Sequence, residues 1–294
     1  MKRASLNVGK LGLWTNQFDN VSISRAVEAT REIEELGYST LWLGELSGRE
    51  ALTQAALLLP GTSHLTLATG VAAVYGRDPV TMAQAQRTLV ESYGDRFLLG
   101  LGISHPWFVE QVRGLTYGPR VPTMRAYLER MDAAPFGPPG APKRSSRVIG
   151  AVGTKMLALA AEHADGALPF GMPAEHTART RALMGPEAFL GVVQAVLLAP
   201  DNRTTRQQAW NHVSESLPNR ASLLRELGYS VDLSGPGAER LVRDLVAWGD
   251  RDAIAARVQA HFDAGADHVS LSVIGTPPDT LPVRQWRDLA GLLD

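Results

Sequence analysis

The stretch "EELGYSTLWLGE", residues 34–45, decides the fold class because it contains a complete helix-to-strand connection. Residues 22–36 place apolar side chains three or four positions apart, which predicts an amphipathic helix, and Gly37 supplies the left-handed residue that commonly ends one. The apolar run after Gly37 predicts a buried strand. The same order of helix, turn and strand recurs in "AEHADGALPF" (161–170) and "FDAGADHVSLSV" (262–273). Asp250 and Gly265 bound the helix that precedes the strand of the second segment.

Eight candidate strands can be traced in this way, most of them separated by one helical pattern. They begin near Lys10, Thr40, Leu65, Phe97, Arg147, Gly166, Phe189 and His268. Strands that alternate with helices indicate an α/β fold with parallel strands, and eight such units in 294 residues predict a closed (β/α)8 TIM barrel. An open, doubly wound sheet is the alternative. It would be favoured by a dinucleotide fingerprint after the first strand, and none is present.

Residues 201–249 are longer than one crossover helix requires. "TRQQAWNHV" (205–213), "NRASLLRELG" (219–228) and "AERLVRDLVAWG" (238–249) are each interpreted as helices. We therefore expect one domain over residues 1–294, with a helical insertion before the last βα unit. Such an insertion could wall a pocket, pack on the barrel or contact a second copy of the chain.

Composition limits the classes of function. The net charge is −1 without a Lys/Arg-rich block, which argues against nucleic-acid binding. No apolar run reaches the length of a membrane span and no secretory signal is recognisable, so we expect a cytoplasmic protein that does not bind membranes. The chain has no cysteine, and its seven histidines show no paired spacing, so no metal site is expected.

In a barrel, the residues that follow the strands form the active-site rim. These positions carry Glu45, which is either a site acid or a surface cap, and His105, which is either a proton donor or a helix cap. Arg77 and Asp78 suggest an internal ion pair that fixes a loop. Three aromatic residues are candidates for the apolar wall of a substrate pocket or for the core: Trp14, Tyr75 and Trp107.

"GAVGTKML", residues 150–157, is the most informative of these rim segments. Glycines bracket a turn, Thr154 could cap the helix that follows, and the unpaired N–H groups of a first helical turn attract phosphate. Lys155 would add a positive charge. An ordinary β-to-α turn is the structural alternative. The G-x-x-G-T-K spacing does not match a P-loop, "GLGISHPW" (100–107) fails as a dinucleotide fingerprint, and G-x-S-x-G is absent.

"ATGVAAVYGRDP", residues 68–79, starts as a buried strand but contains Gly70. Glycine inside a strand weakens the strand and usually marks a bulge or the close approach of another group. We therefore expect a bulge at this position.

Several of these segments together resemble the luciferase-like flavin and deazaflavin oxidoreductases, in particular the actinobacterial branch that uses coenzyme F420. The resemblance rests on "ELGYSTLWLGE" (35–45), "ATGVAAVYGRDPVTMAQAQRTLVESYGDRFLLGLGISH" (68–105), "MRAYLERMDA" (124–133), "GAVGTKMLALAAEHADGALPF" (150–170), "LPNRASLLRELGY" (217–229) and "LVAWGDRDAIAARVQAHFDAGADHV" (245–269). These segments cover most of the chain.

The resemblance implies a barrel that holds a three-ring cofactor against its third strand, where the family has a bulge, often with a non-proline cis peptide. Gly70, Val71 and Ala72 match that bulge, and the small residues are expected to leave room for a flat ring. The resemblance places the cofactor phosphate at the loop of Gly150, Ala151, Val152, Gly153, Thr154 and Lys155, with further contacts from Leu168 and Pro169. It also implies that Glu45 or His105 handles the proton that accompanies hydride transfer. The family commonly has Tyr-Gly-Arg-Pro-Val before the "MRAYL" helix, whereas this chain has Tyr117-Gly118-Pro119-Arg120-Val121.

Three hypotheses about function follow. The first is an F420-dependent oxidoreductase that acts on a small organic molecule. The second is a monooxygenase that uses FMN and dioxygen, and the third is a catalytically silent barrel that binds a cofactor or only dimerises. A homodimer is expected from the resemblance alone.

Overall fold

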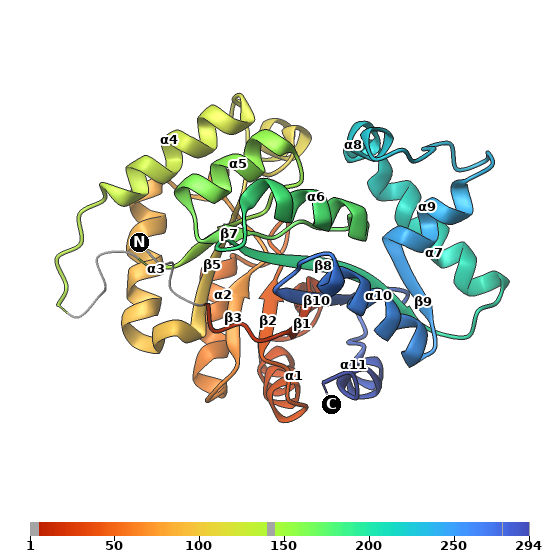
Figure 1. Ribbon diagram of the computed structural model, residues 1–294. Helices are drawn as coiled ribbons and strands as arrows, with labels where there is room; N and C mark the ends of the chain where they lie inside the picture. The colour runs from red at the N-terminus through yellow and green to blue at the C-terminus, as the bar shows by residue number, and fades with distance from the viewer. Residues whose placement is uncertain (1–5, 140–144, 278, 294) are drawn as a thin grey trace.

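The computed structural model describes residues 6–139, 145–277 and 279–293, and it contains a closed barrel of parallel strands (Figure 1). β1 (Leu11–Thr15) pairs with β10 (His268–Val273) and with β2 (Thr40–Leu43), and β10 closes the ring on β8 (Phe189–Leu198). The remaining strands in barrel order are β3 (Thr66–Thr69), β5 (Phe97–Gly102), β6 (Arg147–Ile149) and β7 (Gly166–Ala167). The predicted (β/α)8 architecture is confirmed, and the open sheet is excluded.

Helices surround the barrel in the predicted alternation. They are α1 (Ile23–Glu35), α2 (Ala51–Leu58), α3 (Pro79–Tyr93), α4 (Arg120–Asp132), α5 (Thr154–His163), α6 (Ala174–Met184), α10 (Arg251–Asp263) and α11 (Val283–Ala290). Ser22 and Asp250 cap α1 and α10 through their side chains, and Gly37 and Gly265 follow these helices with φ angles of 88° and 95°. The local signals at both helices are therefore confirmed.

The barrel interior contains a polar contact among its apolar side chains. Trp42 Nε1 donates to His268 Nε2 at 3.0 Å, and His268 also contacts Ser270 Oγ and the carbonyl of Gly9. Both rings are completely buried. Burial lowers the pKa of His268 to about 4, so the imidazole is neutral at neutral pH.

The third strand is broken where the sequence predicts a bulge. β3 ends at Thr69, the Gly70–Val71 peptide bond is cis, and β4 (Ala72–Ala73) resumes the pairing with β5. The break turns the backbone of residues 70–73 toward the rim formed by the carboxyl ends of the strands.

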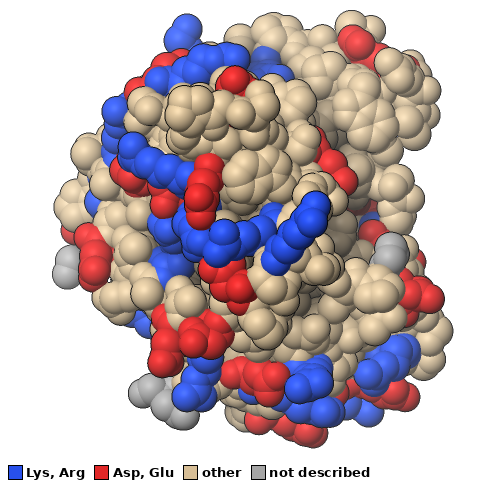
Figure 2. All heavy atoms as spheres, turned by 90° about the vertical axis from the view of Figure 1, so that its right-hand side faces the viewer, with Lys and Arg blue, Asp and Glu red and all other residues tan. Residues whose placement is uncertain are grey.

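The long segment before α10 contains three helices and one strand. α7 (Arg203–Ser216), α8 (Ala221–Glu226) and α9 (Ala238–Leu245) lie together on the right of the barrel in Figure 1. Figure 2 shows acidic and basic side chains mixed over this side, where Arg243 of α9 pairs with Glu239 and Asp201.

One helix prediction is wrong in part. The helical pattern of residues 238–249 ends at Leu245, and β9 (Val246–Gly249) pairs in parallel with β8, with Ala195 opposite Val246. All four residues of β9 are buried. No Gly or Pro separates α9 from β9, so the sequence contains no stop signal, and pairing with the long β8 overrides the helical pattern.

Candidate active site

A cavity of about 560 Å³ lies at the rim formed by the carboxyl ends of the strands. Its walls come from residues that follow β1, β2, β3, β5, β6 and β7, together with the segment between α7 and α8. The cavity gathers many of the predicted site residues: Trp14, Glu45, Gly70, Val71, His105, Gly150, Ala151, Val152 and Leu168. Ala72, Tyr75, Trp107, Gly153, Thr154, Lys155 and Pro169 do not line it.

The reason expected for glycine at position 70 is wrong. A Cβ atom at Gly70 would lie 2.9 Å from Cδ1 of Trp14, and Trp14 Nε1 donates to the Gly70 carbonyl at 2.5 Å. Gly70 therefore makes room for the indole of Trp14 and not directly for a ligand. Both residues line the cavity, so the assignment of Gly70 to cofactor contact stays a prediction.

Val71 fills the space that neighbouring glycines leave open. A Cβ at Gly102 would lie 2.3 Å from Val71 Cγ2, and a Cβ at Gly150 would lie 3.1 Å from Val71 Cγ1. The glycines at the ends of β5 and β6 thus allow the side chain of the cis-linked residue to enter the cavity wall. A larger residue at position 102 would displace Val71.

The segment of residues 150–155 runs from the cavity to the start of α5. Gly150, Ala151 and Val152 line the cavity, whereas Gly153, Thr154 and Lys155 are exposed beside it. Gly153 is the N-cap of α5, and no side chain caps this helix, so the suggestion that Thr154 is the cap is wrong. Among the described residues, the first-turn N–H groups have no side-chain acceptor, and such a helix start attracts an anion.

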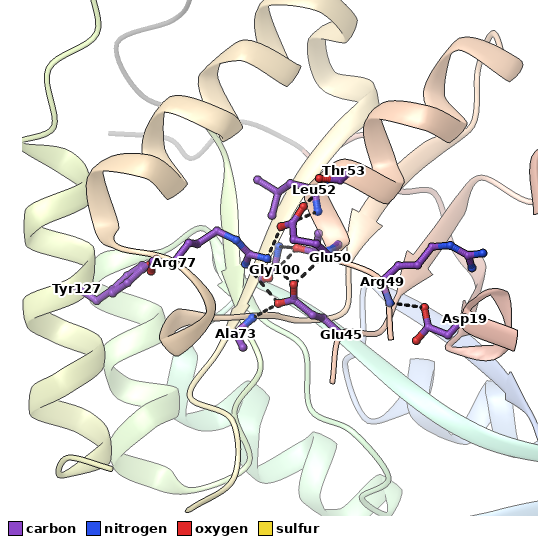
Figure 3. A network of polar contacts seen from close by, with 12 residues as sticks. Asp19, Glu45, Arg49, Glu50, Leu52, Thr53, Ala73, Arg77, Gly100 and Tyr127 are labelled. Carbon is purple, nitrogen blue, oxygen red and sulfur yellow. Dashed lines mark hydrogen bonds and ion pairs between the residues drawn. The ribbon is translucent and has the colours of Figure 1, made fainter. Parts of the chain in front are cut away.

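Glu45 is held in a network of polar contacts on the β2–α2 side of the cavity (Figure 3). Its carboxylate accepts from the N–H of Ala73 in β4 at 2.6 Å and from the N–H of Ala51 at 3.1 Å, and it forms an ion pair with Arg77. Only 4% of the Glu45 side chain is exposed. This geometry favours a structural role, in which Glu45 anchors β4 beside the cis peptide, over the predicted proton transfer.

The expected ion pair between Arg77 and Asp78 is wrong. Arg77 pairs with Glu45 and Glu50, while Asp78 caps α3 by accepting from Val80 N and Thr81 N. Burial acts to lower the pKa of Arg77, but the two glutamates outweigh this effect and raise it. The loop after β4 is therefore fixed by contacts to the segment between β2 and α2 and not by an ion pair between adjacent residues.

His105 lies at the cavity mouth with two arginines near it. Burial lowers its pKa, and the charges of Arg120 and Arg220 lower it further, so the ring is neutral at neutral pH. Ser104, which precedes it, has a φ of 63°, a conformation that is uncommon for a residue other than glycine and that often occurs at functional sites. The position of His105 is compatible with exchange of a proton with a bound molecule.

Two aromatic candidates lie outside the cavity lining. Tyr75 stacks on Tyr117 with 5.5 Å between ring centroids, and its hydroxyl accepts from Gly118 N at 2.7 Å. Trp107 is 48% exposed and packs edge-on against Phe108. Trp14 does line the cavity, where it contacts Phe170 at 4.9 Å between centroids.

Three further residues at this site were not predicted from the sequence: Arg120, Arg220 and His176. Arg120 lines the cavity although the order of Pro and Arg differs from the family pattern. Arg220, from the insertion, also lines it, so the insertion contributes to the cavity wall. His176 of α6 donates from Nε2 to the carbonyl of Val152 at 2.8 Å and thereby fixes the 150–155 segment. Arg220 stands in a segment that carries the family resemblance and Arg120 in one that departs from the family pattern, but their place at the cavity, like that of His176, depends on contacts that only the folded chain makes.

Two further expectations concern metals and membranes. No group of three or more His, Asp or Glu side chains suited to a metal ion occurs within residues 6–139, 145–277 and 279–293. In the same ranges, no helix has the length and apolar character needed to cross a bilayer.

Comparison with known proteins identifies the family. The model of the luciferase-like monooxygenase family matches residues 6–268. A relative, the putative coenzyme F420-dependent oxidoreductase Rv3520c of Mycobacterium tuberculosis, is 28% identical over 190 residues, and the match spans about half of each protein, 54% of this chain and 55% of the relative.

Solved structures share the fold at low sequence identity. The coenzyme F420-dependent tetrahydromethanopterin reductase of Methanopyrus kandleri superposes with a TM-score of 0.70, 15% identity and 98% coverage of both chains. The oxygenating constituent of 3,6-diketocamphane monooxygenase of Pseudomonas putida, in complex with FMN, superposes with a TM-score of 0.74, 13% identity and coverage of 97% of this chain and 96% of that one. With a barrel, a broken third strand and a rim cavity in place, the family match leads to one conclusion: this chain belongs to the luciferase-like monooxygenase family.

Proposed function

We propose that this protein is an F420-dependent oxidoreductase that transfers hydride between the deazaflavin and a small organic substrate. The observation that carries the choice of cofactor is the match to the mycobacterial relative described as F420-dependent. The structure supports it with a cavity of suitable size for a ring system and substrate at the catalytic rim of the barrel.

The residues present fit an elongated cofactor with an anionic tail. The ring system would lie in the cavity beside Val71, and the phosphate would bind at the uncapped start of α5 near Lys155. The exposure of Gly153, Thr154 and Lys155 leaves this helix start open to a ligand. Gly70 and Val71, which would lie beside the ring, are less exposed. Leu168 and Ala151 would supply apolar contacts.

A bound deazaflavin supplies hydride transfer at its central ring. The chain would position the substrate against Trp14 and Phe170 and restrict access of water to the cavity. His105 would give or take the accompanying proton, because its lowered pKa keeps the ring neutral and able to accept one. Glu45 would act indirectly by anchoring the backbone of β4.

A second candidate is an FMN-dependent monooxygenase, favoured by the structural likeness to the FMN complex of the camphane enzyme. A barrel without activity is the third. The homodimer and the cytoplasmic location expected from the sequence stay predictions.

Titration of the purified protein with F420 and, separately, with FMN discriminates among these candidates. We expect F420 to bind at least tenfold more tightly than FMN. The change in cofactor fluorescence measures both affinities. Preferential binding of FMN would favour the monooxygenase, and binding of neither would leave only the silent barrel.

The phosphate site has its own test. Lys155→Ala removes the positive charge beside the start of α5, and we expect F420 affinity to fall roughly tenfold, the size of one charged hydrogen bond. The matched control is Lys10→Ala, because Lys10 precedes β1 at the opposite end of the barrel. Equal affinities of the two variants for F420 would refute the phosphate site.

A further inference from the structure

Two arginines line the cavity without a carboxylate partner. Among the described residues, no Asp or Glu lies within ion-pair distance of Arg120 or Arg220. The carboxylates that also line the cavity are engaged elsewhere, since Glu45 pairs with Arg77 and Asp19 accepts from the backbone N–H of Arg49. The part of the cavity near His105 is therefore positively charged.

Arg220 is the more enclosed of the two arginines. Its guanidinium lies over the ring of Phe170, 5.5 Å from the centroid, and Nη1 donates to the Gly171 carbonyl at 3.0 Å and to Ser216 Oγ at 3.3 Å. Burial lowers its pKa to about 10, which still leaves it charged at neutral pH. Nε and Nη2 have no hydrogen-bond partner among the described residues, so two donors remain available at the cavity.

The position of Arg220 is fixed by the fold. Figure 1 shows α8 as the helix of the insertion that faces α6, and Arg179 of α6 donates to the carbonyl of Glu226 at the end of α8. His105, Arg120 and Arg220 all line the same cavity, and the charges of the two arginines lower the pKa of His105. The Arg220 side chain is half-buried and has no carboxylate partner among the described residues, and a planar guanidinium with free N–H groups matches a carboxylate or phosphate group.

We propose that Arg220, assisted by Arg120, binds an anionic group of the substrate, which makes the substrate a carboxylate or an organic phosphate. The assignment of this group to the substrate rests on the proposed function. The start of α5 would bind the anionic tail of the cofactor, and Arg220 would bind a second anion on the α8 side of the cavity. Neutral molecules of the same shape would bind more weakly.

The test compares matched ligands by calorimetry, with the cofactor absent and present. The pairs are acetate with acetamide, benzoate with benzamide, and phenyl phosphate with phenol. We expect at least one anion to bind tenfold or more tightly than its neutral counterpart. Arg220→Gln should abolish this preference, and Arg120→Gln should reduce it.

Arg225→Gln is the matched control, because Arg225 is exposed on the same short helix and should retain the full preference. Arg220→Lys keeps the charge and should retain part of the preference for anions. If Arg220→Gln is destabilised, this variant distinguishes the loss of charge from the loss of side-chain packing. Circular dichroism reports whether each variant is folded.

Equal binding of anions and neutral molecules by the wild-type protein would overturn the inference, as would an anion preference that survives in Arg220→Gln. A tenfold loss of F420 affinity in Arg220→Gln without any substrate-like anion preference would assign the arginine to the cofactor and also overturn it. Failure of F420 to bind while the Arg220-dependent preference persists would instead contradict the proposed function and leave the anion site intact.

Discussion

At the scale of single residues, the cavity depends on side chains that hold the backbone as much as on side chains that face a ligand. Glu45 links Ala51 of α2, Ala73 of β4 and Arg77, and so it fixes the backbone that follows the cis-linked Val71. Gly70 admits Trp14, and Gly102 admits Val71. A change at any of these positions should therefore shift the cavity wall, since each residue lines the cavity and holds a neighbour in place.

The Glu45–Arg77 pair gives a stability prediction. Arg77→Met leaves a carboxylate that is 4% exposed without its cation, and we expect the free energy of unfolding to fall by about 3 kcal/mol. Arg25→Met is the control, because it breaks an ion pair whose side chains are 43% and 62% exposed and should cost under about 1 kcal/mol. Urea unfolding measures both, and equal losses would show that the Glu45 network does not anchor the rim.

At the scale of elements, the start of α5 is positioned by α6. His176 is 3% exposed and donates to the Val152 carbonyl, while its Nδ1 contacts Thr180 Oγ1 at 3.3 Å. The 150–155 segment is therefore anchored to α6 by a buried residue that does not line the cavity.

His176→Leu should weaken F420 binding about fivefold, roughly the energy of one hydrogen bond, because the anion-binding turn loses its support. Thr180→Val is the companion variant, since it removes only the second contact of the imidazole and should have a smaller effect. Fluorescence titration gives both affinities. Unchanged affinity in His176→Leu would show that the turn is held by its own backbone.

The elements also show what sequence signals can and cannot specify. The helix cap Asp250 and the glycine stops Gly37 and Gly265 are local signals, so they located α1, α10 and the strands that follow. β9 was missed because no stop signal separates it from α9 and only its partner β8 selects the extended form. Likewise, Gly70 signalled the break in β3, but its neighbour Trp14 comes from another strand.

At the scale of the whole molecule, three histidines are buried among the described residues, His176, His261 and His268, and burial lowers the pKa of each. Burial lowers the pKa of His261 and of His268 to about 4, below the ordinary value of 6.5. His261 contacts Thr177 and Gln194, whereas His268 contacts Trp42 inside the barrel. The unfolded chain binds more protons than the folded one between these two pH values, so stability falls as pH decreases through this window.

We expect each of these histidines to reduce the free energy of unfolding by about 3 kcal/mol between pH 6.5 and pH 4, with little further contribution below pH 4. His268→Gln should flatten this slope, whereas His64→Gln, at an exposed position, should leave it unchanged. Urea unfolding at a series of pH values measures the slope. An identical slope in His268→Gln would mean that the buried imidazole is not the proton acceptor.

The barrel also determines which site residues could be foreseen. Positions that directly follow strands, such as His105 and Gly150, could be identified because the rim rule depends only on strand order. Arg220 lies in an insertion whose placement depends on contacts with α6, and the engagement of Glu45 depends on Arg77, 32 residues away. These contacts exist only in the folded chain.

The most direct test of the central claim is a crystal structure of the protein grown with F420. We expect the deazaflavin ring in the rim cavity beside Val71 and the phosphate at the first turn of α5. A ring bound elsewhere, or a phosphate remote from residues 153–155, would contradict it.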